Sequence, residues 1–269
     1  AGPPVILVHG IPGSWRQAVP LALDLAEHYT VILPSRPGYG RTPVKSGRAP
    51  ADQADLYAAI LDALGHEEPA GVVGISGGGP SALAFAQRHP GRTSSLVLVC
   101  AVAAHLIDVP TALRIAVALP PVAHAASVLA RSRQRSVLAN RDKLDRRISA
   151  ELTADERLRL ERDPAIGSDL EAFLRSHAEA PAGIAGLRND ARQLRLARQT
   201  GPAPADRVTS RTLVLHGDED TVVPLDHAQF HAENIAGARL EVLAGAGHVF
   251  LLTRRAEATS SIREHLGAG

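Results

Sequence analysis

The sequence of 269 residues is poor in several residue types, and each scarcity excludes a class of protein. It has a single cysteine, Cys100, so no disulfide can form within the chain. It has no methionine, and aromatic residues make up only 3% of it. No apolar run reaches the roughly 18 residues that a membrane-spanning helix needs. The sequence therefore predicts neither a disulfide-stabilised scaffold nor a membrane span.

The sequence also lacks an excess of charge of either sign. Lys and Arg number 29 and Asp and Glu 28, which leaves a net charge of +1. Such a balance produces no overall field that would attract nucleic acid or an acidic membrane surface. No basic segment followed by an apolar stretch, the pattern of a secretory signal, opens the sequence. We expect a cytoplasmic protein without a nucleic-acid partner.

What is present is a globular composition with alternating strand and helix patterns. Hydrophobic residues make up 45% of the chain and charged residues 21%. Short apolar runs alternate with helical patterns, and this alternation predicts a parallel sheet covered by helices on both faces. The expected strands are Val5–Val8, Thr30–Leu33, Gly71–Ile75 and Ser95–Cys100, and the expected helices lie at about 15–28, 52–64 and 77–88.

The alternation stops between about Ala103 and Pro204. This stretch contains helical patterns rich in Ala, Leu and Arg, interrupted by prolines, and no strand-like run. The strand pattern then returns, with strands expected at 212–216 and 239–243 and helices at about 225–235 and 255–266. We therefore expect an α/β core formed by residues 1–102 and 205–269, and a helical insert formed by residues 103–204. The segment Gly201–Pro204 is expected to be a stiff linker.

The most informative motif is Gly74-Ile75-Ser76-Gly77-Gly78, which lies between an expected buried strand and an expected helix. In this context G-x-S-x-G forms a sharp turn that raises a nucleophilic serine above the edge of the sheet. A glycine-rich phosphate loop is the alternative, because strand, glycines and helix also form nucleotide sites. Neither G-x-G-x-x-G nor the Walker A pattern can be aligned through Ser76. The motif therefore favours Ser76 as a nucleophile.

A serine nucleophile needs a base and an acid that orients the base. His248 follows the last expected strand on the small-residue loop 245–247, which favours it as the base. His9 and His216 also end strands, and we expect both to be structural. The preceding strand is followed by three carboxylates, at 218–220, any of which could instead be a turn residue.

Acyl transfer also needs donors that stabilise an oxyanion. The N–H group of Gly77 opens the helix beside Ser76 and is one candidate. The loop after the first strand should supply the second. Pro12 has no N–H group, so Ile11 is the natural donor. His227 and His231 are four residues apart, but no third ligand accompanies them, and we expect no metal site.

Together these residues resemble the α/β-hydrolase superfamily over about residues 5–100 and 212–266. His9-Gly10-Ile11-Pro12 is similar to the oxyanion loop of that family, and Arg36-Pro37-Gly38-Tyr39-Gly40 is similar to its R-G-x-G loop. The resemblance implies an α/β-hydrolase fold with an inserted helical cap. It also implies a catalytic triad of Ser76, Asp220 and His248, with Asp218 the next choice of acid, and an oxyanion hole formed by Ile11 and Gly77.

The resemblance narrows the activity as well. Epoxide hydrolases and haloalkane dehalogenases carry Asp where this chain has Ser76, and ring-fission hydrolases usually have Trp where it has Val249. Bacterial carboxylesterases with a Ser-Gly-Gly-Gly elbow are the most similar group. We therefore expect a serine esterase, a monomer or homodimer, that cleaves a small carboxylic ester without cofactor or metal. The expected substrate pocket includes Trp15, Val222, Val249 and Phe250.

Two other kinds of function share the same residues. A C–C bond hydrolase, a lactone hydrolase or a cofactor-free perhydrolase would use the same triad. A ligand receptor would keep the fold and turn over slowly or not at all.

Overall fold

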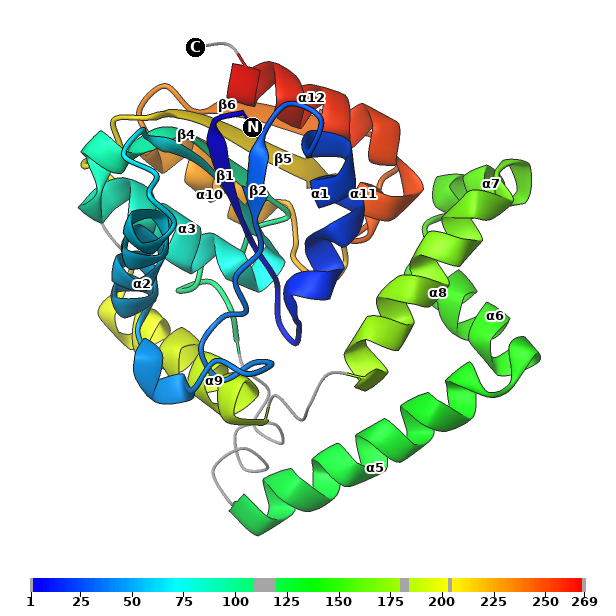
Figure 1. Ribbon diagram of the computed structural model, residues 1–269. Helices are drawn as coiled ribbons and strands as arrows, with labels where there is room; N and C mark the ends of the chain where they lie inside the picture. The colour runs from blue at the N-terminus through cyan, green and yellow to red at the C-terminus, as the bar shows by residue number, and fades with distance from the viewer. Residues whose placement is uncertain (1, 109–119, 180–183, 203–204, 268–269) are drawn as a thin grey trace.

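A computed structural model describes residues 2–108, 120–179, 184–202 and 205–267 (Figure 1). Six parallel strands form a single sheet in the order β2-β1-β3-β4-β5-β6. Their bounds are β1 Pro4–Val8, β2 Thr30–Ile32, β3 Ala70–Ile75, β4 Thr93–Val99, β5 Arg211–Gly217 and β6 Arg239–Leu243. The strand order reverses between β1 and β3, and ligands of open α/β sheets bind at the carboxyl ends of strands around such a point.

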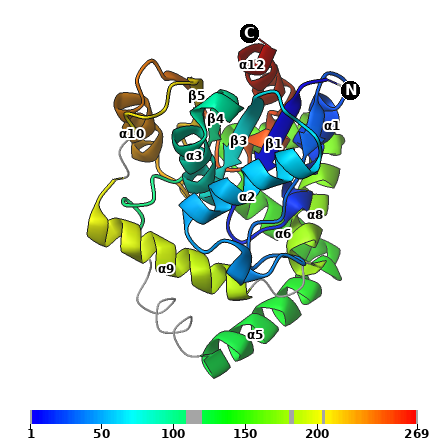
Figure 2. The same ribbon diagram turned by 60° about the vertical axis from the view of Figure 1, so that its left-hand side comes forward.

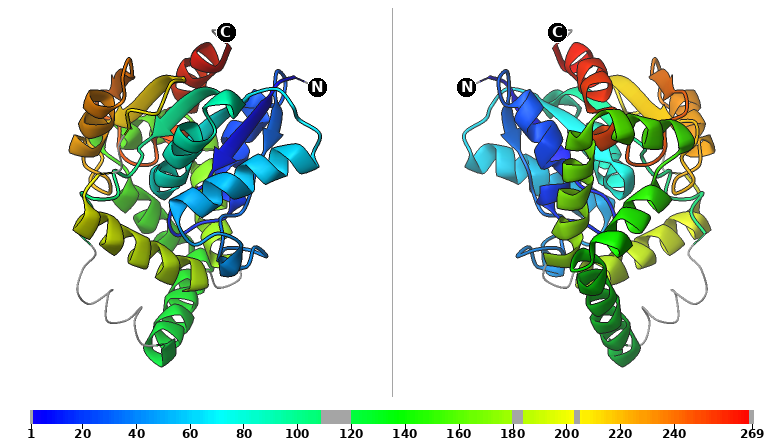
Figure 3. Two further views of the ribbon diagram at one scale, coloured as in Figure 1. Left: turned by 90° about the vertical axis from the view of Figure 1, so that its left-hand side faces the viewer. Right: turned by 90° about the vertical axis from the view of Figure 1, so that its right-hand side faces the viewer.

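Helices cover both faces of the sheet, as the two opposite views of Figure 3 show. One face is covered by α1 (Val19–Leu25) and α12 (Arg255–Gly267), and the other by α2 (Pro50–Ala63), α3 (Gly79–Arg88) and α10 (Asp226–Asn234). Strand β1 has apolar residues on both faces because its side chains alternate between the two layers. Val5 and Leu7 belong to the α1 and α12 layer, whereas Ile6 and Val8 belong to the α2 and α3 layer.

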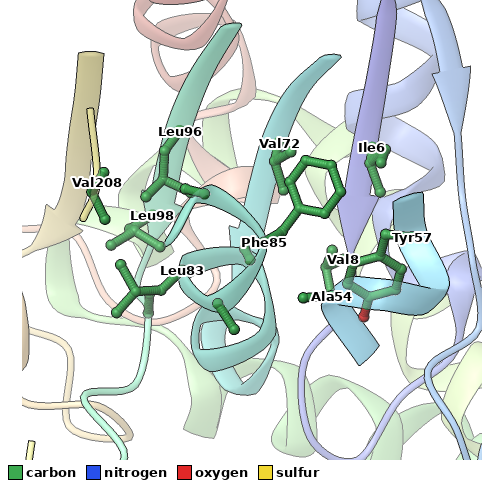
Figure 4. Packing of buried hydrophobic residues seen from close by; sticks show 14 of the residues in the cluster. Ile6, Val8, Ala54, Tyr57, Val72, Leu83, Phe85, Leu96, Leu98 and Val208 are labelled. Carbon is green, nitrogen blue, oxygen red and sulfur yellow. The ribbon is translucent and has the colours of Figure 1, made fainter. Parts of the chain in front are cut away.

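The larger of the two layers is shown in Figure 4. Ile6, Val72 and Leu96 project from three neighbouring strands toward Tyr57 of α2 and Phe85 of α3, and all five side chains are fully buried. Burial of this size contributes about 1.5–3 kcal/mol for each large side chain. The layer holds the carboxyl ends of β1 and β3 in fixed register, which positions the loops that follow them.

Most expected boundaries differ from the structure by one or two residues, and two of the differences have a clear local cause. The helix expected at 15–28 is a short 3-10 turn, Trp15–Ala18, followed by α1, which ends at Leu25. Pro20 lies in the first turn of α1, where its missing N–H costs nothing, so the chain restarts as a new helix there. The fourth strand ends at Val99, because Cys100 has a φ of +38°, which leaves the extended conformation.

Between β4 and β5 every regular element in the described residues is a helix. These helices are α5 (Pro120–Leu138), α6 (Arg141–Glu151), α7 (Ala154–Arg162), α8 (Pro164–Glu179) and α9 (Ile184–Thr200). Pro120 and Pro164 each begin a helix, whereas Pro110, Pro181 and the end of the expected linker at Pro204 lie outside the described residues. Figures 1 and 2 show these helices beside the core rather than within its two layers. None of the described helices is long and apolar enough to cross a membrane.

Helix α9 is attached to the core through a buried ion pair. The Arg36 guanidinium donates to both carboxylate oxygens of Asp190, at 2.6 and 3.3 Å, and Tyr39 Oη donates to Asp190 Oδ2 at 2.6 Å. The side chains of Arg36 and Asp190 are only 5% and 4% exposed. Burial lowers the pKa of Arg36, but the neighbouring Asp190, Tyr39 and Tyr57 side chains more than offset this, so the pKa of the guanidinium is raised and Arg36 stays protonated.

Candidate active site

Ser76 lies at the turn from β3 into the helix that follows it, with a φ of +52°. Its neighbours are small because the surrounding chain leaves no room for side chains. A Cβ atom at Gly74 would lie 2.6 Å from Ala82 Cβ, and one at Gly78 would overlap the Val8 carbonyl. The glycines therefore allow the left-handed conformation of Ser76 and the close approach of β1, as the sequence motif predicts.

The loop after β1 packs against this turn. A Cβ atom at Gly10 would lie 3.1 Å from Ser76 Cβ, and a Cβ atom at Gly77 would overlap the Ile11 side chain. Ile11 and Gly77, the two residues predicted to stabilise an oxyanion, thus lie in contact beside Ser76. Strand pairing brings them together, because β1 and β3 are hydrogen-bonded neighbours.

His248 lies between Ser76 and Asp220. Its Nδ1 is 2.7 Å from Asp220 Oδ2, and its Nε2 is 3.2 Å from Ser76 Oγ. A carboxylate only accepts hydrogen bonds, so Nδ1–H donates to Asp220 and Nε2 is left to accept from the Ser76 hydroxyl. The three side chains form an unbroken hydrogen-bond relay, although Ser76 lies 172 positions and Asp220 lies 28 positions before His248 in the sequence.

The loop after β5 holds the two candidate acids in different environments. Asp220 is buried, and its Oδ1 accepts from the backbone N–H groups of Val222 and Val223, each at 2.8 Å. These two bonds aim the other oxygen, Oδ2, at His248. Asp218 is exposed, and its Oδ1 accepts from Gly245 N–H at 2.6 Å. Only Asp220 lies against His248, whereas Asp218 stabilises the loop conformation.

The groups around His248 raise the affinity of its imidazole for a proton. Burial of the ring lowers the pKa of the imidazole, but the neighbouring Cys100 and Asp220 groups act in the opposite direction and outweigh it. The pKa of His248 is therefore raised above the usual 6.5. Such a histidine is a stronger base than free imidazole, and it stabilises the charge that it gains on accepting a proton.

Cys100 is a neighbour of this relay that the sequence did not reveal. Its Sγ donates a weak hydrogen bond to the His248 carbonyl at 3.8 Å, and the side chain also lines the cavity described below. Within the described residues, Cys100, Asp220 and His248 are the one group of three possible metal ligands, with ligand atoms within 4.8 Å of one another. The 2.7 Å between His248 Nδ1 and Asp220 Oδ2 is shorter than two ligands on one tetrahedral ion require, about 3.3 Å or more. The geometry fits a hydrogen bond better than shared coordination.

Three further histidines, two at strand ends and one on a helix, bind backbone groups. His9 Nε2 accepts from Arg36 N–H at 2.9 Å, and His9 Nδ1 lies 2.9 Å from the Gly10 carbonyl. His216 Nε2 lies 2.8 Å from the Val223 carbonyl, next to the loop of Asp220. His227, on α10, accepts from Ala103 N–H at 2.9 Å. These rings support the loops around the relay and do not reach Ser76.

A cavity of about 780 Å³ opens above Ser76 and is bounded by core loops on one side and by helices of the insert on the other. Ser76 and His248 lie in its wall together with Val222 and Val249. Trp15 and Phe250, which were also expected there, are not among the described lining residues. Phe250, the first residue of α11 (Phe250–Thr253), packs into the α1 and α12 layer and is fully buried there, and Trp15 is 40% exposed beneath Arg16.

Sequence reasoning missed the residues that the insert contributes around His248. Thr153 and Glu156 form a capping box at the start of α7, and this T-x-x-E pattern is readable in the sequence. Both residues contact the segment 245–253, which lies about ninety positions further along the chain. No local pattern in the sequence predicts contacts over such a separation.

Comparisons with known proteins agree with this architecture. The model of a family described as "alpha/beta hydrolase fold" matches residues 3–254. The chain is 28% identical to the uncharacterized hydrolase YcgS of Bacillus subtilis (strain 168), over 97% of this chain and 90% of that protein. It is 29% identical to a 2-hydroxymuconate semialdehyde hydrolase of Pseudomonas sp. (strain CF600), over 99% of this chain and 87% of that one.

Among solved structures, an alpha/beta hydrolase fold protein from Nakamurella multipartita is similar along nearly the whole chain. Its sequence is 32% identical, the TM-score is 0.77, and the match covers 99% of this chain and 92% of that one. The similarity spans both the sheet and the helices inserted between β4 and β5, so the insert is part of the shared architecture.

Proposed function

The chain belongs to the α/β hydrolase fold family, and from that premise we propose that it is a serine hydrolase that cleaves small carboxylic esters. The observation that carries the proposal is the hydrogen-bond relay from Ser76 through His248 to Asp220 at the wall of a cavity. A serine hydroxyl is a weak nucleophile until a base removes its proton, and this arrangement supplies the base and its orienting acid.

In the proposed first step Ser76 Oγ attacks the carbonyl carbon of the ester while its proton passes to His248 Nε2. The carbonyl π electrons move onto oxygen, and the N–H groups of Ile11 and Gly77 stabilise that negative charge. Asp220 stabilises the imidazolium and holds the ring in the tautomer that leaves Nε2 free. The contact of Ile11 with Gly77 beside Ser76 supports this assignment.

Collapse of the tetrahedral intermediate breaks the bond to the alcohol oxygen, which takes the proton from His248 Nε2. This leaves an ester between the acyl group and Ser76. A water molecule then gives a proton to His248 Nε2 and attacks the acyl carbon, and the second collapse returns that proton to Ser76 Oγ and releases the carboxylic acid. No metal or cofactor takes part in the proposed cycle.

The cavity supports a substrate that is mainly apolar. Most side chains around Ser76 are aliphatic or aromatic, including Ile11, Val222, Val249 and, from the insert, Leu138 and Phe173. Apolar walls reward buried hydrocarbon at about 25 cal/mol per Å². We therefore propose that residues 103–204 act as a cap that selects the acyl and alcohol groups, and that the core consists of residues 1–102 and 205–269.

A C–C bond hydrolase is the second candidate. The similarity to a 2-hydroxymuconate semialdehyde hydrolase over almost the whole chain favours it, and the same relay serves that chemistry. Val249 after His248 is the feature that favours esters, since ring-fission hydrolases usually have Trp at that position.

A fluorophosphonate probe, a panel of p-nitrophenyl esters of increasing acyl length and a ring-fission product would test the proposal. We expect Ser76 to be labelled and the shorter esters to be hydrolysed faster than the ring-fission product. Labelling with turnover of the ring-fission product alone would favour the second candidate. Labelling without turnover of either class would indicate a receptor, and failure to label would refute Ser76 as the nucleophile.

A further inference from the structure

We propose that Glu156, on α7 of the insert, is a positioning residue that holds the loop of His248 in register with Ser76. The proposal rests on the proposed function, because it takes His248 to be the base. It extends that function by making docking of the insert a condition for alignment of the relay. The insert would then contribute to the chemical step as well as to the choice of substrate.

Glu156 is fully buried although it belongs to a surface helix of the insert. Its Oε1 accepts from Gly247 N–H at 3.2 Å and from Thr253 Oγ1 at 2.7 Å, and its Oε2 accepts from Thr153 N–H at 3.0 Å. Burial of a carboxylate is costly unless hydrogen bonds compensate for the lost water. Two of the three donors belong to the segment around His248, and Gly247 directly precedes it.

A second contact joins the same helix end to the same loop. Thr153 Oγ1 accepts from Glu156 N–H at 3.1 Å and donates to the Gly245 carbonyl at 2.7 Å. The capping box of α7 therefore serves two purposes: it satisfies the start of the helix and it binds residues 245 and 247. Gly247 has no side chain because a Cβ atom there would lie 2.9 Å from Glu156 Oε2 and 3.0 Å from Thr153 Cγ2.

The segment on the other side of His248 is held by apolar packing. Val249 and Leu252 are 8% and 6% exposed, and both belong to the hydrophobic cluster of the insert rather than to either core layer. The other buried members of that cluster are Leu144, Ile148, Leu152, Ile166 and Leu170. The backbone before and after His248 is thus bound to the insert, while its ring is turned toward Asp220 and Ser76.

This attachment matters because the contact that transfers the proton is long. His248 Nε2 lies 3.2 Å from Ser76 Oγ, at the outer limit of reach for a general base. A displacement of about 1 Å in such a site can cost about 100-fold in rate. A carboxylate that fixes the residue before His248 therefore controls kcat without touching the substrate.

The test compares Glu156→Gln with a control that weakens the insert elsewhere. The Gln side chain keeps the shape, but its NH₂ group must face either Gly247 N–H or Thr153 N–H, which places one donor against another. The control is Asn140→Ala, which removes the N-cap of α6, where Asn140 Oδ1 accepts from Lys143 N–H at 3.0 Å. Both changes weaken a helix start in the insert, but only the first removes a hydrogen bond between the insert and the loop of His248.

We expect Glu156→Gln to lower kcat for p-nitrophenyl acetate by roughly 10- to 100-fold, with KM nearly unchanged. The acid limb of the kcat/KM profile and the downfield NMR signal of the His248 Nδ1 proton should both shift. Asn140→Ala should lower Tm by about as much as Glu156→Gln does, but its kcat should stay within about twofold of wild type. A Glu156→Gln enzyme with the kcat, pH profile and proton signal of Asn140→Ala would overturn the proposal.

The NMR signal separates this inference from the proposed function. A wild-type protein that neither reacts with the fluorophosphonate nor hydrolyses esters would refute the function, whereas an active wild type with an unaltered Glu156→Gln signal and rate would refute only the positioning role. Should Glu156→Gln fold poorly, Thr253→Val supplies the same comparison in milder form. This change on α11 removes one of the hydrogen-bond donors to Glu156 Oε1.

Discussion

Among the residues that the structure describes, two that are not glycine have a left-handed backbone, Ser76 at a φ of +52° and Cys100 at +38°, and both lie at the wall of the cavity. A side-chain-bearing residue in this region costs of order 1–3 kcal/mol and persists only where the surroundings impose it. At Ser76 the strand-to-helix turn imposes it and lifts the hydroxyl toward His248. At Cys100 the same conformation ends β4 and turns the thiol toward the His248 carbonyl.

Replacement of Ser76 by Ala tests the nucleophile directly. We expect Ser76→Ala to lower kcat by a factor of roughly 10⁴ or more, because no other hydroxyl takes its place in the relay. Tm should change by only a few degrees, since a side chain at the cavity wall loses one hydrogen bond. Ester hydrolysis at close to the wild-type rate would contradict the assignment.

The choice of acid is tested by two matched substitutions in one loop. Asp220→Asn should lower kcat by about 10³-fold or more, because the amide no longer stabilises the imidazolium and permits the wrong tautomer. It should also lower the pKa of His248, since Asp220 is one of the groups that raise it. The acid limb of kcat/KM, expected above pH 6.5 in the wild type, should then move down.

Asp218→Asn is the control, because Asp218 is exposed and binds only the backbone of Gly245. We expect its rate to fall by less than about tenfold, which corresponds to a weakened loop contact. A larger fall in kcat for Asp218→Asn than for Asp220→Asn, measured on the same short ester, would show that Asp218 is the acid of the relay.

Among the elements, α10 contributes a dependence of stability on pH. Burial is the main reason that the pKa of His231 is lowered, to about 4, and burial also lowers the pKa of His227 one turn earlier. A histidine with a lowered pKa binds fewer protons in the folded state than in the unfolded state, where its pKa is about 6.5. The stability it contributes is present above pH 6.5 and is lost as the pH falls from 6.5 toward 4.

Urea unfolding between pH 7.5 and 5 measures this loss. The full shift at His231 corresponds to up to roughly 3 kcal/mol, of which about half should be lost by pH 5. In the His231→Gln protein the free energy of unfolding should depend less on pH than in the wild type. The variant itself should be less stable than the wild type at pH 7.5. The control is His28→Gln, which replaces an exposed histidine beyond the end of α1. An equal slope in wild type and His231→Gln would refute this origin of the acid sensitivity.

At the scale of the whole molecule, the cavity lies between two parts of the insert that are attached to the core separately: helix α9, and the cluster of α6 to α8. Helix α9 is tied to the core through Arg36 and Asp190, and the cluster of α6 to α8 is tied to it through Val249 and Leu252. These two attachments leave the space between them lined by apolar side chains above Ser76. Substrate selection is therefore expected to depend on residues that are remote from the relay in sequence.

Phe173 on α8 is suited to test that expectation, because it lines the cavity from the insert. We expect Phe173→Ala to change the ratio of kcat/KM for octanoate to acetate esters by roughly tenfold, while kcat for the acetate ester stays within a few-fold. Phe230→Ala, on α10 and outside the described cavity wall, should leave the ratio unchanged. A similar ratio in all three proteins would mean that α8 does not select the acyl group.

Local patterns in the sequence were sufficient for the strands, most helices and the elbow. Short runs without polar residues identify β1 and β3 as strands buried on both faces, and the glycines around Ser76 identify the turn between strand and helix. These features depend on neighbours within a few positions, and backbone geometry fixes their meaning. The family resemblance and the candidates Ser76 and His248 follow from such patterns, whereas Asp220 is what the resemblance implies.

The arrangement of the site was decided only by the tertiary structure. Three carboxylates after β5 are equivalent in sequence, and only the backbone bonds of Val222 and Val223 to Asp220 turn one of them toward His248. Likewise T-x-x-E at 153–156 predicts a helix start, but not that its carboxylate binds Gly247. Contacts between residues about ninety positions apart depend on how whole elements pack, and no periodicity along the chain encodes that packing.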